Sequence, residues 1–159
     1  MTAPQKRPLN PPEISAAAVR LLAERGTDVP SAHEIAAAAG MSRSAFFRRF
    51  ASTGDAVFAD HDTLLEELEE LLSSTPLAPS AAIIVGARRI LDHHLAQPET
   101  TRLRADIMRE SPALRDRELV VSHRYERVYA KYLVEHADLE IWEVVALSAS
   151  IVAIHNATL

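Results

Sequence analysis

Residues 31–50 read SAHEIAAAAGMSRSAFFRRF, two short helical patterns separated by Gly40. The first pattern opens with Ser31 and Glu34, whose spacing is that of a capping box. The second opens with Ser42, a residue type that favours the N-cap of a helix. Two helices that meet through small residues and turn at a glycine are typical of a helix-turn-helix. This stretch therefore predicts a helix-turn-helix.

The second helix of this pair is expected over about residues 43–50. Phe46 and Phe50 lie four residues apart, so both should face the first helix. The outward side should then carry Arg43, Ser44, Phe47 and Arg48. The N-terminal half of a recognition helix meets base edges in the major groove, where arginine can bind guanine through two hydrogen bonds. The pattern therefore predicts that this helix reads DNA.

Helical patterns also flank this stretch. Residues 11–25 have apolar residues at helical spacing, start after Asn10 and end before Gly26. On the other side, a third capping box at Ser52 opens an apolar stripe that predicts one long helix over about 53–72.

The whole chain has 159 residues, of which only four are glycine, and is rich in Ala, Leu, Glu and Arg. This composition predicts an all-α fold. Further helices are expected over about 80–96, 98–110, 112–136 and from 138 onward. We expect a disordered arm over residues 1–9, a helix-turn-helix domain over 10–54 and a helical regulatory and dimerisation domain over 55–159, with the 53–72 helix as connection.

Charge is unevenly distributed along the chain. The formal net charge is −5, yet residues 1–52 hold seven Lys and Arg against four Asp and Glu. A basic head on an acidic body is typical of a DNA reader with a separate regulatory part. The absence of Cys excludes disulfide scaffolds and cysteine nucleophiles. No apolar run approaches the roughly 20 residues of a membrane span and no signal core is present, so we expect a cytoplasmic protein.

Residues 12–72 resemble the N-terminal domain of the TetR family of bacterial transcriptional regulators. The matching pieces are VRLLAERG at 19–26, SAHEIAAAAGMSRSAFFRRF at 31–50 and STGDAVFA at 52–59. The resemblance implies a homodimer that binds a palindromic operator in double-stranded DNA. It also implies that a small-molecule effector binds inside the helical bundle. We expect a repressor that the effector releases from its operator, and the sequence leaves open an activator or a regulator without an effector.

The resemblance further implies which residues contact DNA. Ser42 would contact phosphate, and Arg43, Ser44 and Ala45 would lie toward the bases. The expected DNA-binding set is Ser31, Ser42, Arg43, Ser44, Ala45, Phe47, Arg48, Arg49 and Thr53.

Two positions depart from the family's usual pattern. Phe47 stands where the family often has Tyr, and Thr53 stands where it often has Lys; both usual residues touch phosphate. Phe47 cannot form a hydrogen bond and Thr53 carries no charge, so Arg48 and Arg49 are expected to compensate. Two placements of Phe47 are possible. Its ring could contact a thymine methyl or a sugar in the DNA groove, or it could be partly buried in the protein core.

The C-terminal part offers candidates for two further sites. The expected effector pocket is lined by Met108, His123, Tyr125, Tyr129 and Trp142, although aromatic residues at helical spacing also suit a plain core or an interface. The last helix is apolar on nearly every side, so it must be covered on every side. A partner subunit is expected to contact Ile141, Val145, Ser148, Ala149 and Val152.

We expect no enzyme, cofactor or metal site. His33-Glu34 begins like a zinc-protease motif, but Ala37 stands where the second His is needed. The segment 60–62, Asp-His-Asp, and the pair His93-His94 could approach each other across two helices and bind a metal. Adjacent helical residues point in different directions, which weakens that reading. The alternative to a DNA-binding regulator is a helical ligand- or metal-binding protein without DNA activity.

Overall fold

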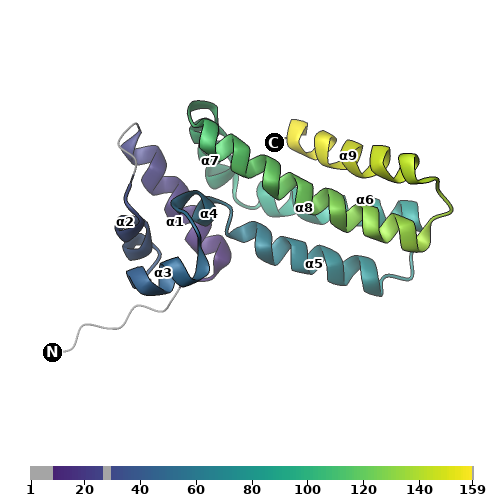
Figure 1. The fold of residues 1–159 in the computed structure, drawn as a ribbon, viewed down its shortest axis with the longest axis horizontal. Coiled ribbons are helices and arrows are strands. Elements are labelled where there is room, and N and C mark those ends of the chain that lie inside the picture. The colour runs from purple at the N-terminus through teal and green to yellow at the C-terminus, as the bar shows by residue number, and fades with distance from the viewer. Residues whose placement is uncertain (1–8, 27–29, 159) are drawn as a thin grey trace. The chain divides into compact units, whose positions relative to one another are not determined.

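A computed structural model describes residues 9–26 and 30–158, and every helix or strand assigned in that part of the chain is an α-helix (Figure 1). The all-α prediction is confirmed. The arm expected over residues 1–9 lies, apart from Leu9, outside the described residues. The helices are α1 (Pro11–Arg25), α2 (Ala32–Ala38), α3 (Arg43–Arg49), α4 (Thr53–Val57), α5 (Asp60–Ser74), α6 (Pro79–Leu95), α7 (Pro98–Glu110), α8 (Pro112–His136) and α9 (Ile141–Thr158).

The helices form two compact units. The N-terminal unit comprises residues 1–62 and 103–117, and the C-terminal unit comprises 63–102 and 118–159. Residues 103–117 fall within the range expected for the regulatory domain, yet their contacts place them in the N-terminal unit. The second half of α7 is therefore part of the same packed body as the helix-turn-helix.

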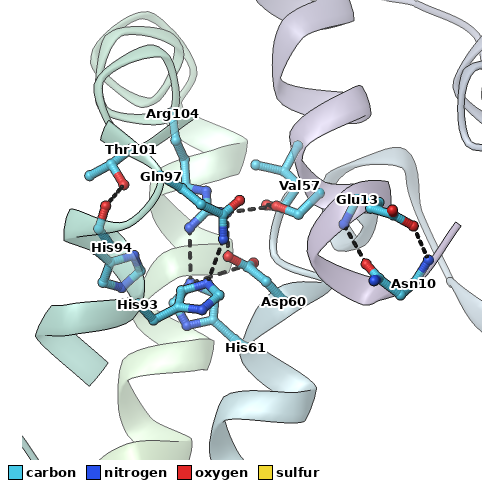
Figure 2. A network of polar contacts seen from close by, with 11 residues as sticks. Asn10, Glu13, Val57, Asp60, His61, His93, His94, Gln97, Thr101 and Arg104 are labelled. Carbon is cyan, nitrogen blue, oxygen red and sulfur yellow. Dashed lines mark hydrogen bonds and ion pairs between the residues drawn. The ribbon is translucent and has the colours of Figure 1, made fainter. Parts of the chain in front are cut away.

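Capping residues set the starts of the first helices. The Asn10 side chain accepts a hydrogen bond from the Glu13 backbone N–H at 2.9 Å, and the Glu13 carboxylate accepts one from the Asn10 N–H at 2.8 Å (Figure 2). Ser31 and Glu34 make the same reciprocal pair at α2. The α1 helix ends at Gly26, whose φ of 58° lies in a region that suits glycine. Each of these ends is the one that the sequence predicts.

The prediction of a single helix over 53–72 is wrong, because α4 ends at Val57 and a second helix, α5, begins at Asp60. The N–H of Phe58 donates to the Asp55 carbonyl at 3.2 Å, a tight three-residue turn. Every residue from Ala56 to His61 is buried. Successive residues of a straight helix point about 100° apart, so six in a row would circle the helix and could not all face one core. The turn allows all six to be buried.

The core of the N-terminal unit joins α1, α2 and α3. Ile14 and Val19 of α1, Ile35 of α2 and Phe46 of α3 are completely buried, and Phe50 is nearly so. The Phe46 and Phe50 rings pack with their centroids 5.2 Å apart. The inward placement predicted for both phenylalanines is confirmed.

The C-terminal unit is a bundle of α5, α6, α8 and α9. Its core is built from Leu64, Leu68, Leu72, Ala82, Ile90, Tyr129, Leu133, Val144 and Val152. Gly86 of α6 allows a close approach to α5, because a Cβ there would lie 2.7 Å from Leu68 Cδ1. Rings from α6 and α9 meet at His94 and His155, 5.4 Å apart. Over the described ranges, no helix has both the length and the apolar character that crossing a bilayer requires.

Candidate nucleic-acid interface

The turn between α2 and α3 depends on Gly40. Its φ of 66° is left-handed, which a residue with a side chain adopts at a cost. This conformation lets the Met41 N–H donate to the Ala36 carbonyl at 2.8 Å and the Gly40 N–H donate to Ala37 at 3.0 Å. Ala36 is completely buried, since only a small residue fits where the two helices meet. The turn therefore holds α2 and α3 as a helix-turn-helix.

The α3 helix presents a basic surface. Ser42 caps it by accepting a hydrogen bond from the Ala45 N–H at 3.1 Å. Arg43, Arg48 and Arg49 are exposed, and α3 contains no carboxylate. A helix N-terminus also offers free N–H groups to anions, so this surface is suited to a polyanion.

Phe47 belongs to this surface and not to the core. Its side chain is 48% exposed, and its ring stands perpendicular to the buried ring of Phe46, with the centroids 5.6 Å apart. The Arg43 guanidinium carbon lies 5.7 Å from the centroid of the Phe47 ring. Of the two positions that the sequence left open, the structure supports the outward one.

The predicted contacts at the edges of this surface differ in their surroundings. Ser31 is exposed, but its hydroxyl donates to Glu34 at 2.9 Å within the α2 cap. The Ser31 backbone N–H also donates to Glu34 and is the main reason that the pKa of this carboxyl is lowered. Thr53 is half-buried at the start of α4. Ser44 is exposed and Ala45 is half-buried, on the same helix as the arginines.

The sequence of this region was compared with known families. Residues 14–59, from α1 to just beyond α4, match the model described as bacterial regulatory proteins, tetR family. Residues 14–59 are a TetR-family helix-turn-helix domain. TetR-family regulators are DNA-binding proteins that are not enzymes, and this domain indicates a transcriptional regulator. No curated protein matched the chain.

The five expected effector residues differ in burial and in the unit to which they belong. Tyr125 and Tyr129 are buried in the C-terminal unit, but His123 is exposed on α8 and Trp142 is 67% exposed on α9. Met108 belongs to the N-terminal unit. The reason is that adjacent polar and aromatic residues of α8 point to different sides of the helix, which the sequence alone does not orient.

The expected dimer residues lie on two faces of α9. Ile141, Val145 and Ala149 are exposed, whereas Ser148 and Val152 are buried within the unit. Ser148 donates its hydroxyl to the Val144 carbonyl at 2.9 Å, one turn earlier in the same helix. Only the first three residues are therefore available to a partner in the described structure.

Sequence reasoning missed a buried polar network around Arg104 of α7. Its Nη2 donates to Asp60 Oδ2 at 2.8 Å and to Ser15 Oγ at 2.6 Å, and its Nη1 lies 3.2 Å from His61 Nε2 (Figure 2). Ser15 in turn donates to the Val57 carbonyl at 2.6 Å. This network ties α7 to α1 and to the turn after α4. The burial of Arg104, although not the identity of its partners, could have been inferred from its position at the apolar spacing of α7.

Asp60 and His61 thus bind an arginine, where their residue types had suggested a metal. Among the residues that the structure describes, no group of three or more His, Asp or Glu side chains could hold a metal ion.

Proposed function

We propose that this protein is a homodimeric repressor that binds a palindromic operator through α3 of each subunit and leaves it when a small molecule binds. The observation that carries the proposal is the exposed face of α3, with three arginines and no carboxylate, in a TetR-family domain. In a helix-turn-helix, this helix enters the major groove.

The proposal gives each residue of this surface a role. We assign the base-facing side to Arg43, Ser44, Ala45 and Phe47, and phosphate contacts to Ser31, Ser42, Arg48, Arg49 and Thr53. Phe47 cannot hydrogen-bond, but its exposed ring suits the methyl group of a thymine. Its contact with Arg43 restricts the guanidinium and so favours one base-reading geometry.

The exposed face of α9 supports the dimer. Ile141, Trp142 and Val145 are each more than half exposed, which is unusual for neighbouring large apolar residues on one helix. Ala149 continues this face and is small enough for close helix approach. A second copy would cover these residues by two-fold symmetry, in which the same patch faces itself.

The buried hydroxyl of Tyr129 supports an effector in the C-terminal unit. It has no hydrogen-bond partner among the described residues, and burial raises the pKa of the phenol above its usual value. A buried polar group without a partner is destabilising, so a bound molecule that supplies the partner would gain affinity. Tyr125, one turn earlier in α8, is buried beside the same core.

Selection of bound DNA from a random pool tests the reader. The expected product is a two-fold symmetric site whose half-sites lie about 34–36 Å apart, or a multiple of it, along the duplex. On that site, Arg43→Ala should cost about 1–3 kcal/mol and relax specificity at one base pair. Arg48→Ala should weaken all sequences alike and reduce the salt slope by roughly one unit.

Arg127→Ala serves as the control, since Arg127 is exposed on α8 in the C-terminal unit and its loss should leave DNA binding unchanged. If no DNA is retained at moderate salt, the protein is instead a helical ligand-binding protein without DNA activity.

Sedimentation at micromolar concentration tests the dimer. Val145→Glu places a charge on the exposed face of α9 and should shift the protein to monomers. Ile84→Glu is the control, because Ile84 is also more than half exposed, at 68% against 58% for Val145, but lies on α6. A monomeric wild-type protein would contradict the proposed dimer.

A further inference from the structure

A groove of about 590 Å³ runs along α5 and α8 within the C-terminal unit. Its walls include Glu66, Glu69 and Glu70 from α5, and Tyr132, Glu135 and His136 from α8. A volume of this order falls in the range of sites for small organic molecules, roughly 300–1,000 Å³. None of these six residues was expected to form a site from the sequence.

The groove has uncompensated negative charge. Four of its lining residues are glutamates, and Lys131 is its one lysine. None of these five side chains forms an ion pair in the part of the chain that the structure describes, whereas Glu67, outside the groove on the same helix, pairs with Arg89. A concave surface lined by one sign of charge concentrates ligands of the opposite sign.

An independent feature of the groove is its aromatic wall. Tyr132 is only 6% exposed, and its ring stacks on His136 with centroids 4.5 Å apart and planes 19° from parallel. His136 is held in place because its Nδ1 donates to the Tyr132 carbonyl at 3.0 Å. Tyr132 lines the groove, so this largely buried residue brings a phenol to its wall. A buried side chain that lines the groove thus offers a polar group to a ligand.

The rest of the wall consists of two apolar residues, Leu72, which is buried, and Val128, which is half-buried, together with the exposed Ser73. A ligand that uses the whole groove therefore needs a positive charge and an apolar body. An ammonium near the carboxylates would gain Coulomb attraction, and one above an aromatic face would gain a cation–π contact.

We propose that this groove binds a small organic cation, an ammonium that carries an aromatic or branched apolar group. The ammonium lies among Glu66, Glu69 and Glu135, and the apolar group lies against Tyr132 and Leu72. The Tyr132 hydroxyl forms a hydrogen bond to the ligand. That the cation is also the effector of DNA release rests on the proposed function.

Equilibrium dialysis of the full-length protein without DNA tests the site. The probe is 1-naphthylmethyl-trimethylammonium, compared with neutral 1-naphthylmethanol, anionic 1-naphthylacetate and spermidine, a cation without an aromatic group. The proposal expects saturable binding of the ammonium probe at least about tenfold tighter than any of the other three. Equal binding of the neutral compound, or tighter binding of spermidine, would overturn it.

Charge-neutral variants locate the binding. Glu69→Gln and Glu135→Gln should each weaken the ammonium probe by about two- to fivefold, the size expected of exposed charge pairs. Glu67→Gln makes the same change outside the groove and should leave the affinity within twofold. Tyr132→Phe should weaken the probe by about threefold or more, as loss of one hydrogen bond does. Unchanged affinity in all three groove variants, each folded by circular dichroism, would overturn the assignment.

A separate measurement of DNA affinity with and without the probe distinguishes the two proposals. Release of DNA by the probe in the wild-type protein, lost in Glu69→Gln, supports the regulatory role. Probe binding without any change in DNA affinity overturns that role and leaves the binding site standing. A protein that binds the probe but never retains DNA overturns the proposed function alone.

Discussion

Two buried polar side chains, one in each unit, differ in their hydrogen bonding. In the N-terminal unit, the terminal nitrogens of Arg104 contact Ser15, Asp60 and His61 at 2.6–3.2 Å. In the C-terminal unit, the Tyr129 hydroxyl is buried with no partner in the described structure.

The contacts of Arg104 specify one geometry, whereas the Tyr129 hydroxyl retains the capacity for a further hydrogen bond. Hydrogen bonds are directional, so the Arg104 network specifies one arrangement of α1, α7 and the turn before α5. Hydrocarbon packing is not directional and tolerates adjustment. A DNA-reading unit needs fixed spacing of its contacts, whereas the ligand that we propose for the C-terminal unit would supply a partner for the Tyr129 hydroxyl.

Asp60→Ala should have the largest effect. It leaves the Arg104 guanidinium buried without its carboxylate, and breaking a buried ion pair costs about 3–5 kcal/mol. Urea unfolding measures the loss. The control is Asp92→Ala, which breaks an exposed pair with Arg88 and should cost less than about 1 kcal/mol. Similar losses for the two variants would show that the network does not fix the N-terminal unit.

Ser15→Ala should come second, with a loss of about 1–3 kcal/mol. Ser15 accepts from Arg104 and donates to the Val57 carbonyl, so its removal leaves two buried groups short of a partner. Ser150→Ala removes an exposed hydroxyl bonded to its own helix and should stay within about 0.5 kcal/mol. A neutral Ser15→Ala would contradict the role given to this serine.

Tyr129→Phe should be neutral or stabilise the protein by up to about 1 kcal/mol, because it removes a buried hydroxyl that has no partner. Thermal unfolding in the absence of ligand provides the measurement. The contrast between the bonded Ser15 and the unpartnered Tyr129 hydroxyl fails if Tyr129→Phe loses as much stability as Ser15→Ala.

The smallest expected effect is a pH dependence from His155 of α9. Burial lowers the pKa of its imidazole below the usual 6.5, so the unfolded chain takes up a proton at a higher pH than the folded chain. The contribution of His155 to stability is therefore complete above about pH 6.5 and falls as the pH drops toward the lowered value.

In His155→Gln, the loss of stability between pH 7.5 and 5.5 should shrink by less than about 1 kcal/mol. Urea titrations at the two pH values measure it, with the exposed His33→Gln as control. A steeper loss of stability on acidification in His155→Gln than in the wild type would contradict the predicted direction of this effect.

Local sequence signals predicted the DNA-reading part well. The caps at Asn10, Ser31 and Ser42 and the glycines at 26 and 40 act within about four residues of the chain. Their effect depends little on the rest of the fold, so helix ends and the helix-turn-helix could be read from the amino acids. The spacing of Phe46 and Phe50 predicted the buried side of α3 for the same reason.

The features that escaped prediction join distant parts of the chain. Arg104 meets Asp60 and Ser15 across 44 and 89 residues, and no local pattern announces such a pair. The break after Val57 exists because six consecutive residues are buried, which only the packed neighbours impose. The groove of α5 and α8 likewise arises where two amphipathic faces meet. Helix positions follow from short-range hydrogen bonds, but the side that each helix buries, and the partner of each charge, depend on packing between elements.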